Sequence, residues 1–320
     1  AAGDSTVGFF PELVPGSDHY LERRVNTCEI CEVADMIGLS LKLTLAGVGD
    51  YWEDVDRWVR NQFVEGQLTH DKLGPFLEKL HSGTLLQRPP ARPFDWERPV
   101  QPWDDTYHSR QGHFQEQPVH PWQSAEIERA VGGFAIKSYA NDFGPHVGHA
   151  CCTGNAARTL YWVWDSILTR ENGVVRVNLP LNRASPWLDV DSHLPYQGKV
   201  VLTVKNAGRV AFRVPEWTRR EEVACDVNGL PRAVDWSGGY VEIGGLKPGD
   251  SATVDFPMKT DSFFRVIGDI PYRLRTRGNT VVNIDPKGKA IPLYQRERYE
   301  GDEAPAKRVT RFASEETVYW

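Results

Sequence analysis

The stretch Glu171-Asn-Gly-Val-Val-Arg-Val-Asn-Leu179 marks the point where the pattern of apolar residues changes from helical to strand-like. Beyond Gly173 apolar residues tend to alternate with polar ones, which is typical of half-buried strands. The pattern recurs in segments 175–179, 200–205, 210–214, 240–243 and 252–256, with turn signals at 228–229, 238–239 and 247–250. Many short strands joined by regular turns predict a β-sandwich domain over residues 171–320.

The preceding part, residues 1–170, predicts a mainly helical domain. Segment 32–46 is apolar on most faces, as expected of a buried helix. A second helix follows Asp50 and carries an apolar stripe at helical spacing; we expect its other face to be solvated, namely Asp54, Asp56, Arg57 and Arg60. A third helix is predicted from about Asn155 to Leu168. The fold class is therefore α followed by β.

Composition and charge limit the classes of function. A length of 320 residues suits two domains with real cores. The net charge of −6 and the lack of a long basic run argue against a nucleic-acid partner. No apolar run reaches the roughly 18 residues needed to span a membrane. The first residues lack the features of a signal peptide, so we expect a soluble protein that is either cytoplasmic or exported after removal of a signal.

The cysteines carry the chemistry in this sequence. Cys151 and Cys152 are adjacent in Gly144-Pro-His-Val-Gly-His-Ala-Cys-Cys-Thr-Gly-Asn155, just before a predicted helix, and Glu29-Ile-Cys31 opens another. Together these residues offer one carboxylate and three sulfurs, a donor set that suits a single zinc ion. Five cysteines are an odd number and too few for a disulfide scaffold. The alternative for an adjacent pair is buried packing or a strained disulfide.

Two further cysteines and two histidines complete the candidates. Cys28 could replace Cys31 as a ligand, but we favour Cys31 because zinc prefers the carboxylate of Glu29 to an amide. Cys225 lies in a predicted strand and is expected to be structural. His146 and His149 could hold a sugar hydroxyl or activate a thiol, and a helix start favours a thiolate nearby. A cysteine peptidase that pairs Cys152 with His149 is a weak alternative, because no matching nucleophile motif is present.

These motifs resemble those of the β-L-arabinofuranosidases of glycoside hydrolase family 127 and their relatives. The resemblance rests on Glu29-Ile-Cys31, on Cys151-Cys-Thr-Gly-Asn155 and, more weakly, on Phe212-Arg-Val-Pro-Glu-Trp217 and Gly238-Gly-Tyr-Val-Glu-Ile243. It covers most of residues 26–260. It implies the C-terminal part of a catalytic (α/α)6 barrel, of the six-hairpin glycosidase type, followed by a β-sandwich.

The resemblance also implies a reaction and the residues that perform it. Zn²⁺ would be held by Glu29, Cys31, Cys151 and Cys152. Cys151 would attack the anomeric carbon, and hydrolysis of the glycosyl-thioether would give net retention. The substrate would be a β-L-arabinofuranoside or a related exo-linked sugar, within a glycoside or an oligosaccharide. Glu12 is the best match for the general acid that protonates the leaving oxygen, with Glu22 as the fallback.

Two departures from the family pattern shape a second hypothesis. Thr153-Gly154 stands where the family has Pro-Pro, and only about 170 residues precede the predicted sandwich, whereas a six-hairpin barrel needs about a dozen helices of ~11 residues. We therefore expect the N-terminal half of the barrel, or a second copy of the chain, as a partner, and the isolated chain to be a poor catalyst. The alternative is a non-catalytic carbohydrate-binding or scaffold protein stapled by a closed, structural zinc site.

Overall fold

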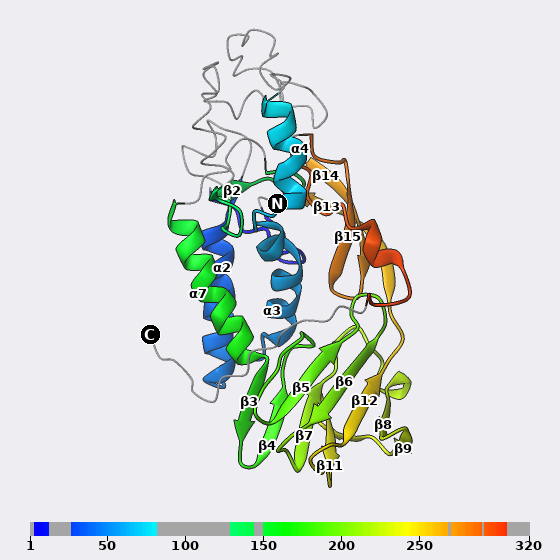
Figure 1. The fold of residues 1–320 in the computed structure, drawn as a ribbon. Coiled ribbons are helices and arrows are strands. Elements are labelled where there is room, and N and C mark those ends of the chain that lie inside the picture. The colour runs from blue at the N-terminus through cyan, green and yellow to red at the C-terminus, as the bar shows by residue number, and fades with distance from the viewer. Residues whose placement is uncertain are drawn as a thin grey trace.

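The computed structural model describes residues 3–12, 27–81, 129–143, 150–267, 270–289 and 291–305 (Figure 1). Helices come first and strands follow. The helical elements are α2 (Ile30–Leu45), α3 (Trp52–Trp58), the π-helical segment η1 (Val59–Phe63), α4 (His70–His81) and α7 (Ala150–Ser166). Within the described residues no helix is both long and apolar enough to cross a membrane.

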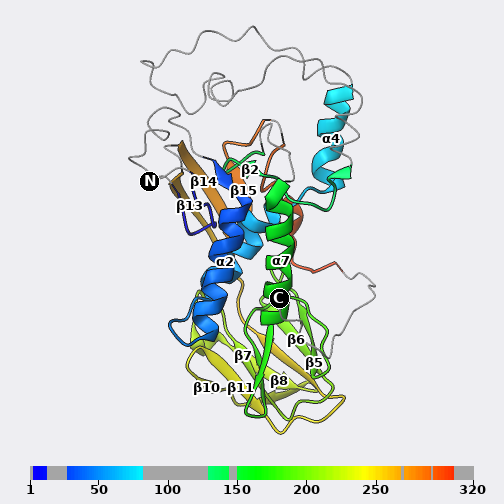
Figure 2. The ribbon, with the colours of Figure 1, turned by 90° about the vertical axis from the view of Figure 1, so that its left-hand side faces the viewer.

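Helices α2 and α7 run side by side and in the same direction (Figures 1 and 2). Contacts between the two helices follow one another along their length. Thr159 donates from Oγ1 to the carbonyl of Ala34 (3.3 Å), and one turn further Trp162 lies against Gly38. A Cβ at Gly38 would lie 2.7 Å from the Trp162 ring, so only glycine permits this close approach. The parallel packing brings the two helix starts together at one end of the pair.

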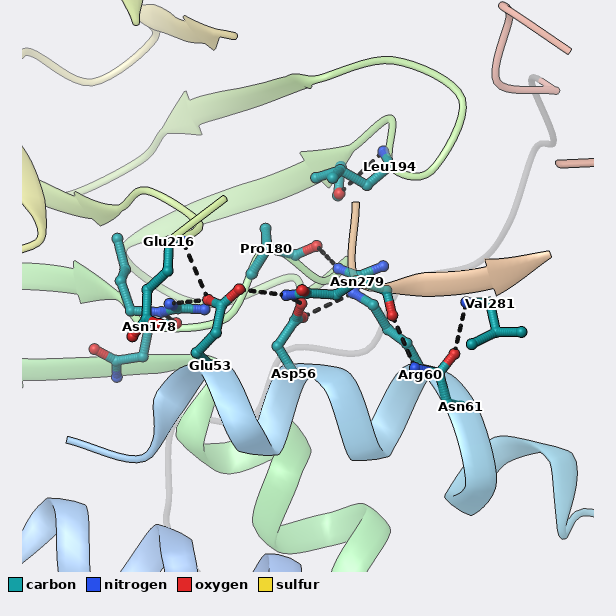
Figure 3. Close-up of polar contacts among 12 residues, drawn as sticks. Glu53, Asp56, Arg60, Asn61, Asn178, Pro180, Leu194, Glu216, Asn279 and Val281 are labelled. Atoms are coloured by element: carbon teal, nitrogen blue, oxygen red, sulfur yellow. Dashed lines mark hydrogen bonds and ion pairs between the residues drawn. The ribbon is translucent and has the colours of Figure 1, made fainter. Parts of the chain in front are cut away.

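The polar face of the helix after Asp50 was expected to be solvated, and this is wrong for Asp56 and Arg60, whereas the side chains of Asp54 and Arg57 are each 32% exposed. Asp56 is 2% exposed, and the side chain of Arg60, which donates to it from Nε (2.8 Å), is 9% exposed. Glu53 pairs with Arg213 Nη1 (2.6 Å), and Asn279 Nδ2 donates to both Glu53 (2.7 Å) and Asp56 (2.8 Å) (Figure 3). The buried part of this face is polar because it meets polar partners from distant strands rather than water.

The strands form three larger sheets, and all five segments predicted as strands are confirmed. The first five-stranded sheet has the order β10-β11-β7-β4-β3, the second has β5-β6-β12-β8-β9, and the third sheet has β13-β14-β15. Neighbouring strands are antiparallel except for the parallel pair β4 and β7. The bounds are β3 (Leu168–Glu171), β4 (Val174–Val177), β5 (Leu188–Ser192), β6 (Lys199–Val204), β7 (Arg209–Arg213), β8 (Ala224–Val227), β9 (Leu230–Arg232), β10 (Asp235–Ser237), β11 (Tyr240–Gly244), β12 (Ser251–Asp255), β13 (Thr260–Ile267), β14 (Ile270–Arg277) and β15 (Thr280–Asp285).

The third sheet lies beside α3 and η1 rather than with the two five-stranded sheets (Figure 1). Asn61 links the two parts, because its side chain donates to the carbonyl of Asn279 (2.8 Å) and accepts from the amide of Val281 (2.8 Å). Helix α7 ends at Ser166, and β3, the first strand of the three larger sheets, begins at Leu168, which was predicted as the last helical residue. The division of the chain into domains at residue 170 stays a prediction.

Candidate metal and catalytic site

Glu29, Cys31, Cys151 and Cys152 form one cluster, in which one donor atom from each residue lies within 4.8 Å of all the others. The Cys31 sulfur is 3.2 Å from that of Cys152 and 3.7 Å from that of Cys151. Glu29 Oε1 lies 3.3 Å from the Cys152 sulfur and 3.9 Å from the Cys151 sulfur. Three thiols and a carboxylate thus surround a single point, an arrangement that can hold a metal ion.

Both cysteine motifs lie at helix starts. Glu29 precedes α2, and Cys31 lies in the first turn of that helix. Cys151 and Cys152 lie in the first turn of α7, which begins at Ala150. This corrects the expectation that the cysteine pair precedes its helix. The positive ends of two helix dipoles therefore meet at the cluster, where they favour negative charge on sulfur.

A short segment between residues 134 and 138 ties the two helix starts together. Its strand β2 (Lys137–Ser138) pairs with β1 (Cys28–Glu29). Ile136 accepts at its carbonyl from the amide of Ile30 (3.1 Å), and the Cys152 thiol points at the same carbonyl (3.6 Å). Thr153 exchanges hydrogen bonds with the backbone of Phe134 (3.0 and 3.2 Å). Nothing in the sequence singled out this segment, since it carries no motif of its own.

The four residues of the cluster differ in their exposure to solvent. Cys152 is fully buried, Glu29 and Cys31 are half-buried, and Cys151 is exposed. Burial is the main cause that raises the pKa of both Cys31 and Cys152 above that of an ordinary thiol. The protein alone therefore keeps these two thiols protonated, and a bound cation would be needed to hold them as thiolates. The exposed sulfur of Cys151 is the one that a ligand in solvent can reach.

Asn155, the last residue of the cysteine motif, joins α7 to α2. Its Nδ2 donates to the carbonyl of Cys31 (3.2 Å) and to Oδ1 of Asp35 (2.9 Å). Arg158 contacts the side chains of both Asn155 and Asp35 on the exposed side. Asn155 is thus in a position to fix the backbone that carries the Cys31 sulfur.

Cys28 and Cys225 lie outside the cluster. Cys28 is fully buried, its thiol points at the carbonyl of Glu29 (3.8 Å), and burial raises its pKa well above the usual value. Cys225 lies in β8, is 7% exposed and contacts the backbone of Asp226. The structure therefore groups Cys31, rather than Cys28, with the cysteine pair.

Glu12 lies next to the segment that carries Glu29, because Pro11 forms an antiparallel bridge with Cys28. Its amide donates to the carbonyl of Thr27 (2.7 Å), and its carboxylate accepts from the Thr27 hydroxyl (2.7 Å) and forms an ion pair with Lys137. Lys137 is the cross-strand partner of Glu29. The fallback Glu22 and the histidines His146 and His149 lie outside the described residues.

Glu32 is a further acidic group at the site that the sequence analysis did not single out. It lies in the first turn of α2, and its Oε2 accepts from the amide of Glu29 (3.1 Å). Burial raises the pKa of Glu32 to about 7, and the nearby carboxylates of Glu29 and Glu12 add to the rise. Its spacing of three residues from Glu29 is that of a capping box, which is the signal that could have identified it.

Comparison with protein families finds one match. Residues 175–258 match the model described as "Beta-L-arabinofuranosidase, GH127 middle domain". The matched segment spans β4 to β12 and does not include the cysteine cluster. No curated protein matches the chain.

Solved structures give a set of distant likenesses. A GH127 β-L-arabinofuranosidase from Geobacillus stearothermophilus T6 aligns over 81% of this chain and 36% of its own, with 17% identity and a TM-score of 0.48. A protein described as a glycoside hydrolase aligns over 80% and 37%, with 18% identity and a TM-score of 0.46. A GH127 β-arabinofuranosidase aligns over 87% and 51%, with 16% identity and a TM-score of 0.40. The chain thus spans between about a third and a half of the length of these structures.

Proposed function

Since the chain belongs to glycoside hydrolase family 127 and its relatives, we propose that it is a retaining glycoside hydrolase with Cys151 as the nucleophile. The single observation that carries the proposal is the cluster of one carboxylate and three sulfurs, in which only Cys151 is exposed. A β-L-arabinofuranoside or a related exo-linked sugar is the proposed substrate. We also propose that the helices are part of an (α/α)6 barrel and that the two five-stranded sheets form a β-sandwich.

The proposed metal is Zn²⁺. Zinc–sulfur bonds of about 2.3 Å in tetrahedral geometry place the sulfurs about 3.8 Å apart. The sulfur separations of 3.2 and 3.7 Å from Cys31 are close to that value, so a small adjustment of the side chains would accommodate the ion. Glu29 would supply the fourth ligand. When bound, the ion would lower the pKa of the thiols and keep them as thiolates.

The reaction needs two acts from the residues of this chain. The Cys151 sulfur forms a bond to the anomeric carbon while the glycosidic carbon–oxygen bond breaks, and Glu12 gives a proton to the leaving oxygen. Water then attacks the same carbon, Glu12 takes its proton, and the carbon–sulfur bond breaks. Each displacement inverts the configuration of the anomeric carbon, so the two together restore the original configuration.

The test compares the chain with its Cys151→Ser variant. Release of sugar from a p-nitrophenyl β-L-arabinofuranoside is measured together with the anomeric form of the first product. We expect low turnover by the isolated chain, a product that retains configuration, and loss of turnover in the variant. Activity of Cys151→Ser equal to that of the unaltered chain would reject Cys151 as the nucleophile.

A second function is favoured by the contacts of Glu12. Its ion pair with Lys137 and its hydrogen bond from Thr27 engage the carboxylate that the reaction needs as an acid. On this alternative the cluster is a closed structural zinc site in a carbohydrate-binding or scaffold protein. Sugar binding that survives Cys151→Ser, with no hydrolysis by either form, would favour the alternative. The matched variant Lys137→Met would raise turnover if the ion pair restrains Glu12 and leave it unchanged otherwise.

A further inference from the structure

A separate cavity of about 580 Å³ lies between the start of α4, the segment that follows η1 and the chain that follows β15. This volume falls within the usual range for small-molecule sites, roughly 300–1,000 Å³. None of its lining residues belongs to the cysteine cluster. The cavity is therefore separate from the proposed reaction site at that cluster.

The lining of the cavity is strongly basic. Five basic side chains line it against two acidic ones; the basic residues are Lys72, Lys287, Lys289, Arg296 and Arg298, and the acidic residues are Glu65 and Asp71. The chain as a whole has a net charge of −6, so the concentration of positive charge here is local. A concave surface lined by one sign of charge raises the local concentration of the opposite ion.

The floor of the cavity is a buried ion-pair triad. Glu65 is 3% exposed and binds Arg296 Nε through Oε1 (2.5 Å) and Lys72 Nζ through Oε2 (3.0 Å). One carboxylate thus serves two cations. Burial lowers the pKa of Lys72, Glu65 opposes that change, and the charges of Arg296 and Arg298 lower it further. Positive charge is in excess at the floor even before the rim is considered.

The rim is a fixed loop that carries Lys287 and Lys289. Asp142 accepts hydrogen bonds from the backbone amides of Lys289 (2.8 Å) and Ile291 (2.6 Å). Gly288 lies so close to the carbonyl of Asn141 that a Cβ would come within 2.2 Å of it. The two exposed lysines therefore extend from an anchored backbone. Less conformational entropy of this loop is then lost when a ligand binds.

One wall of the cavity is aromatic. The ring of Tyr299 is half-buried and packs edge-on against Tyr196, with centroids 5.5 Å apart. The guanidinium groups of Arg298 and Arg296 lie 4.9 and 5.8 Å from the Tyr299 ring centroid. An aromatic ring flanked by cations offers a surface for an apolar ring face next to groups that bind an anion.

We propose that this cavity binds an anionic sugar, with its carboxylate or sulfate held by Lys287 and Lys289 and its ring packed against Tyr299. Charge-assisted hydrogen bonds supply the affinity and the aromatic ring supplies the preference for a sugar over a bare ion. The site needs no covalent step, and it is distinct from the position of the reacting sugar at Cys151.

The test is a calorimetric titration of the full chain with D-glucuronate, D-glucose and sodium sulfate at low ionic strength. Glucuronate should bind at least about tenfold more tightly than glucose, since one charge-assisted hydrogen bond contributes roughly that factor. The double variant Lys287→Ser/Lys289→Ser should lose at least about tenfold in glucuronate affinity. Arg232→Ser/Lys247→Ser removes the same charge from exposed positions elsewhere and should leave the affinity unchanged.

A third variant separates the sugar from its charge. Tyr299→Leu should weaken glucuronate binding severalfold and leave sulfate binding unchanged, with melting temperatures of all variants compared to confirm the fold. Equal affinity for glucuronate and glucose, or unchanged affinity in the Lys287→Ser/Lys289→Ser variant, would overturn the proposal. Binding of sulfate without glucuronate would overturn it as well, because the cavity would then be an anion site only.

Discussion

The buried polar network at α3 and the cysteine cluster at the starts of α2 and α7 both gather polar groups from distant parts of the chain. In the network, Glu53 and Asp56 each have a cationic partner, and Asn279 serves both (Figure 3). In the cluster, the contacts among the four donor atoms join thiols to thiols and to a carboxylate. The network gives each buried carboxylate a cation of the protein, although Nη2 of Arg213 has no hydrogen-bond partner among the described residues. The cluster offers only electron-pair donors around its centre.

This difference separates a structural role from a ligand-binding role. Removal of either partner of a buried acid–base pair leaves an uncompensated buried charge, which destabilises the fold. A set of donors without a cation holds its two helices together weakly, and binding of a metal ion would add its free energy to the stability of the fold. The two regions should therefore respond in opposite ways to mutation and to removal of metal.

The largest expected effect is on stability, at the network. Arg213→Met removes the cation from Glu53, which stays 5% exposed. The free energy of unfolding should fall by about 3–5 kcal/mol, the usual loss when one partner of a buried pair is removed. Urea unfolding measures the change, and bound metal per folded chain should stay the same. A loss below about 1 kcal/mol, the size usual for an exposed ion pair, would contradict the role of the Arg213–Glu53 pair as a buried ion pair that stabilises the fold.

The next effect is on metal binding, at the cluster. Cys31→Ser should weaken zinc binding by about a hundredfold or more, because loss of an outer hydrogen-bond partner alone already costs 10- to 100-fold. Zinc bound per chain is measured by elemental analysis and by competition with a chelator. Cys225→Ser, a buried cysteine outside the cluster, is the matched control and should bind zinc as the unaltered chain does. Equal zinc binding by Cys31→Ser and the control would contradict the ligand set.

The comparison also shows which features the sequence could predict. Alternation of apolar residues located β4, β6, β11 and β12, because each of these strands has one face in the core. The same pattern located β7, although β7 is buried on both faces. Donor chemistry grouped Glu29 with three cysteines although 120 residues separate Cys31 from Cys151. Few residue types bind metals, so such a set stands out in a sequence.

Polar partners inside the protein could not be predicted in this way. The face that carries Asp56 and Arg60 has the pattern of a solvated surface, and its partners Arg213 and Asn279 lie far along the chain, at 160 and 226 residues from Glu53. A helical pattern reports that a face is polar but not whether water or protein meets it. Similarly, α7 begins at Ala150 rather than at the predicted Asn155, and it includes Gly154 although glycine lowers helix propensity by about 1 kcal/mol. Tertiary contacts of Thr153 and Asn155 with the rest of the site accompany the earlier start.

A smaller effect tests whether the cluster depends on residues around it. Asn155→Ala removes the hydrogen bond to the carbonyl of Cys31 and should weaken zinc binding by about tenfold, the lower end for an outer partner. Arg158→Ala is the control: Arg158 contacts Asn155 and Asp35, and among the described residues it forms no hydrogen bond or ion pair with a donor residue of the cluster. Its ion pair with Asp35 is exposed. Competition with a chelator measures both. Equal losses in the two variants would show that Asn155 acts through the surface ion pair rather than through Cys31.

The smallest effect concerns pH and a third buried carboxylate, Glu65, which is paired internally as Glu53 is. Burial alone would raise the pKa of Glu65, but Arg296 and Lys72 outweigh it and hold the pKa below its usual range. A lowered pKa contributes stability that is present above about pH 4.5 and is lost as the pH falls below that value. The unfolding free energies of the unaltered chain and Glu65→Gln should therefore converge below about pH 4.5, by no more than about 1.4 kcal/mol per pH unit, since a single proton is involved. The exposed variant Glu221→Gln should follow the unaltered chain at every pH, and a gap for Glu65→Gln that stays constant down to pH 3 would place Glu65 outside the class of internally paired carboxylates.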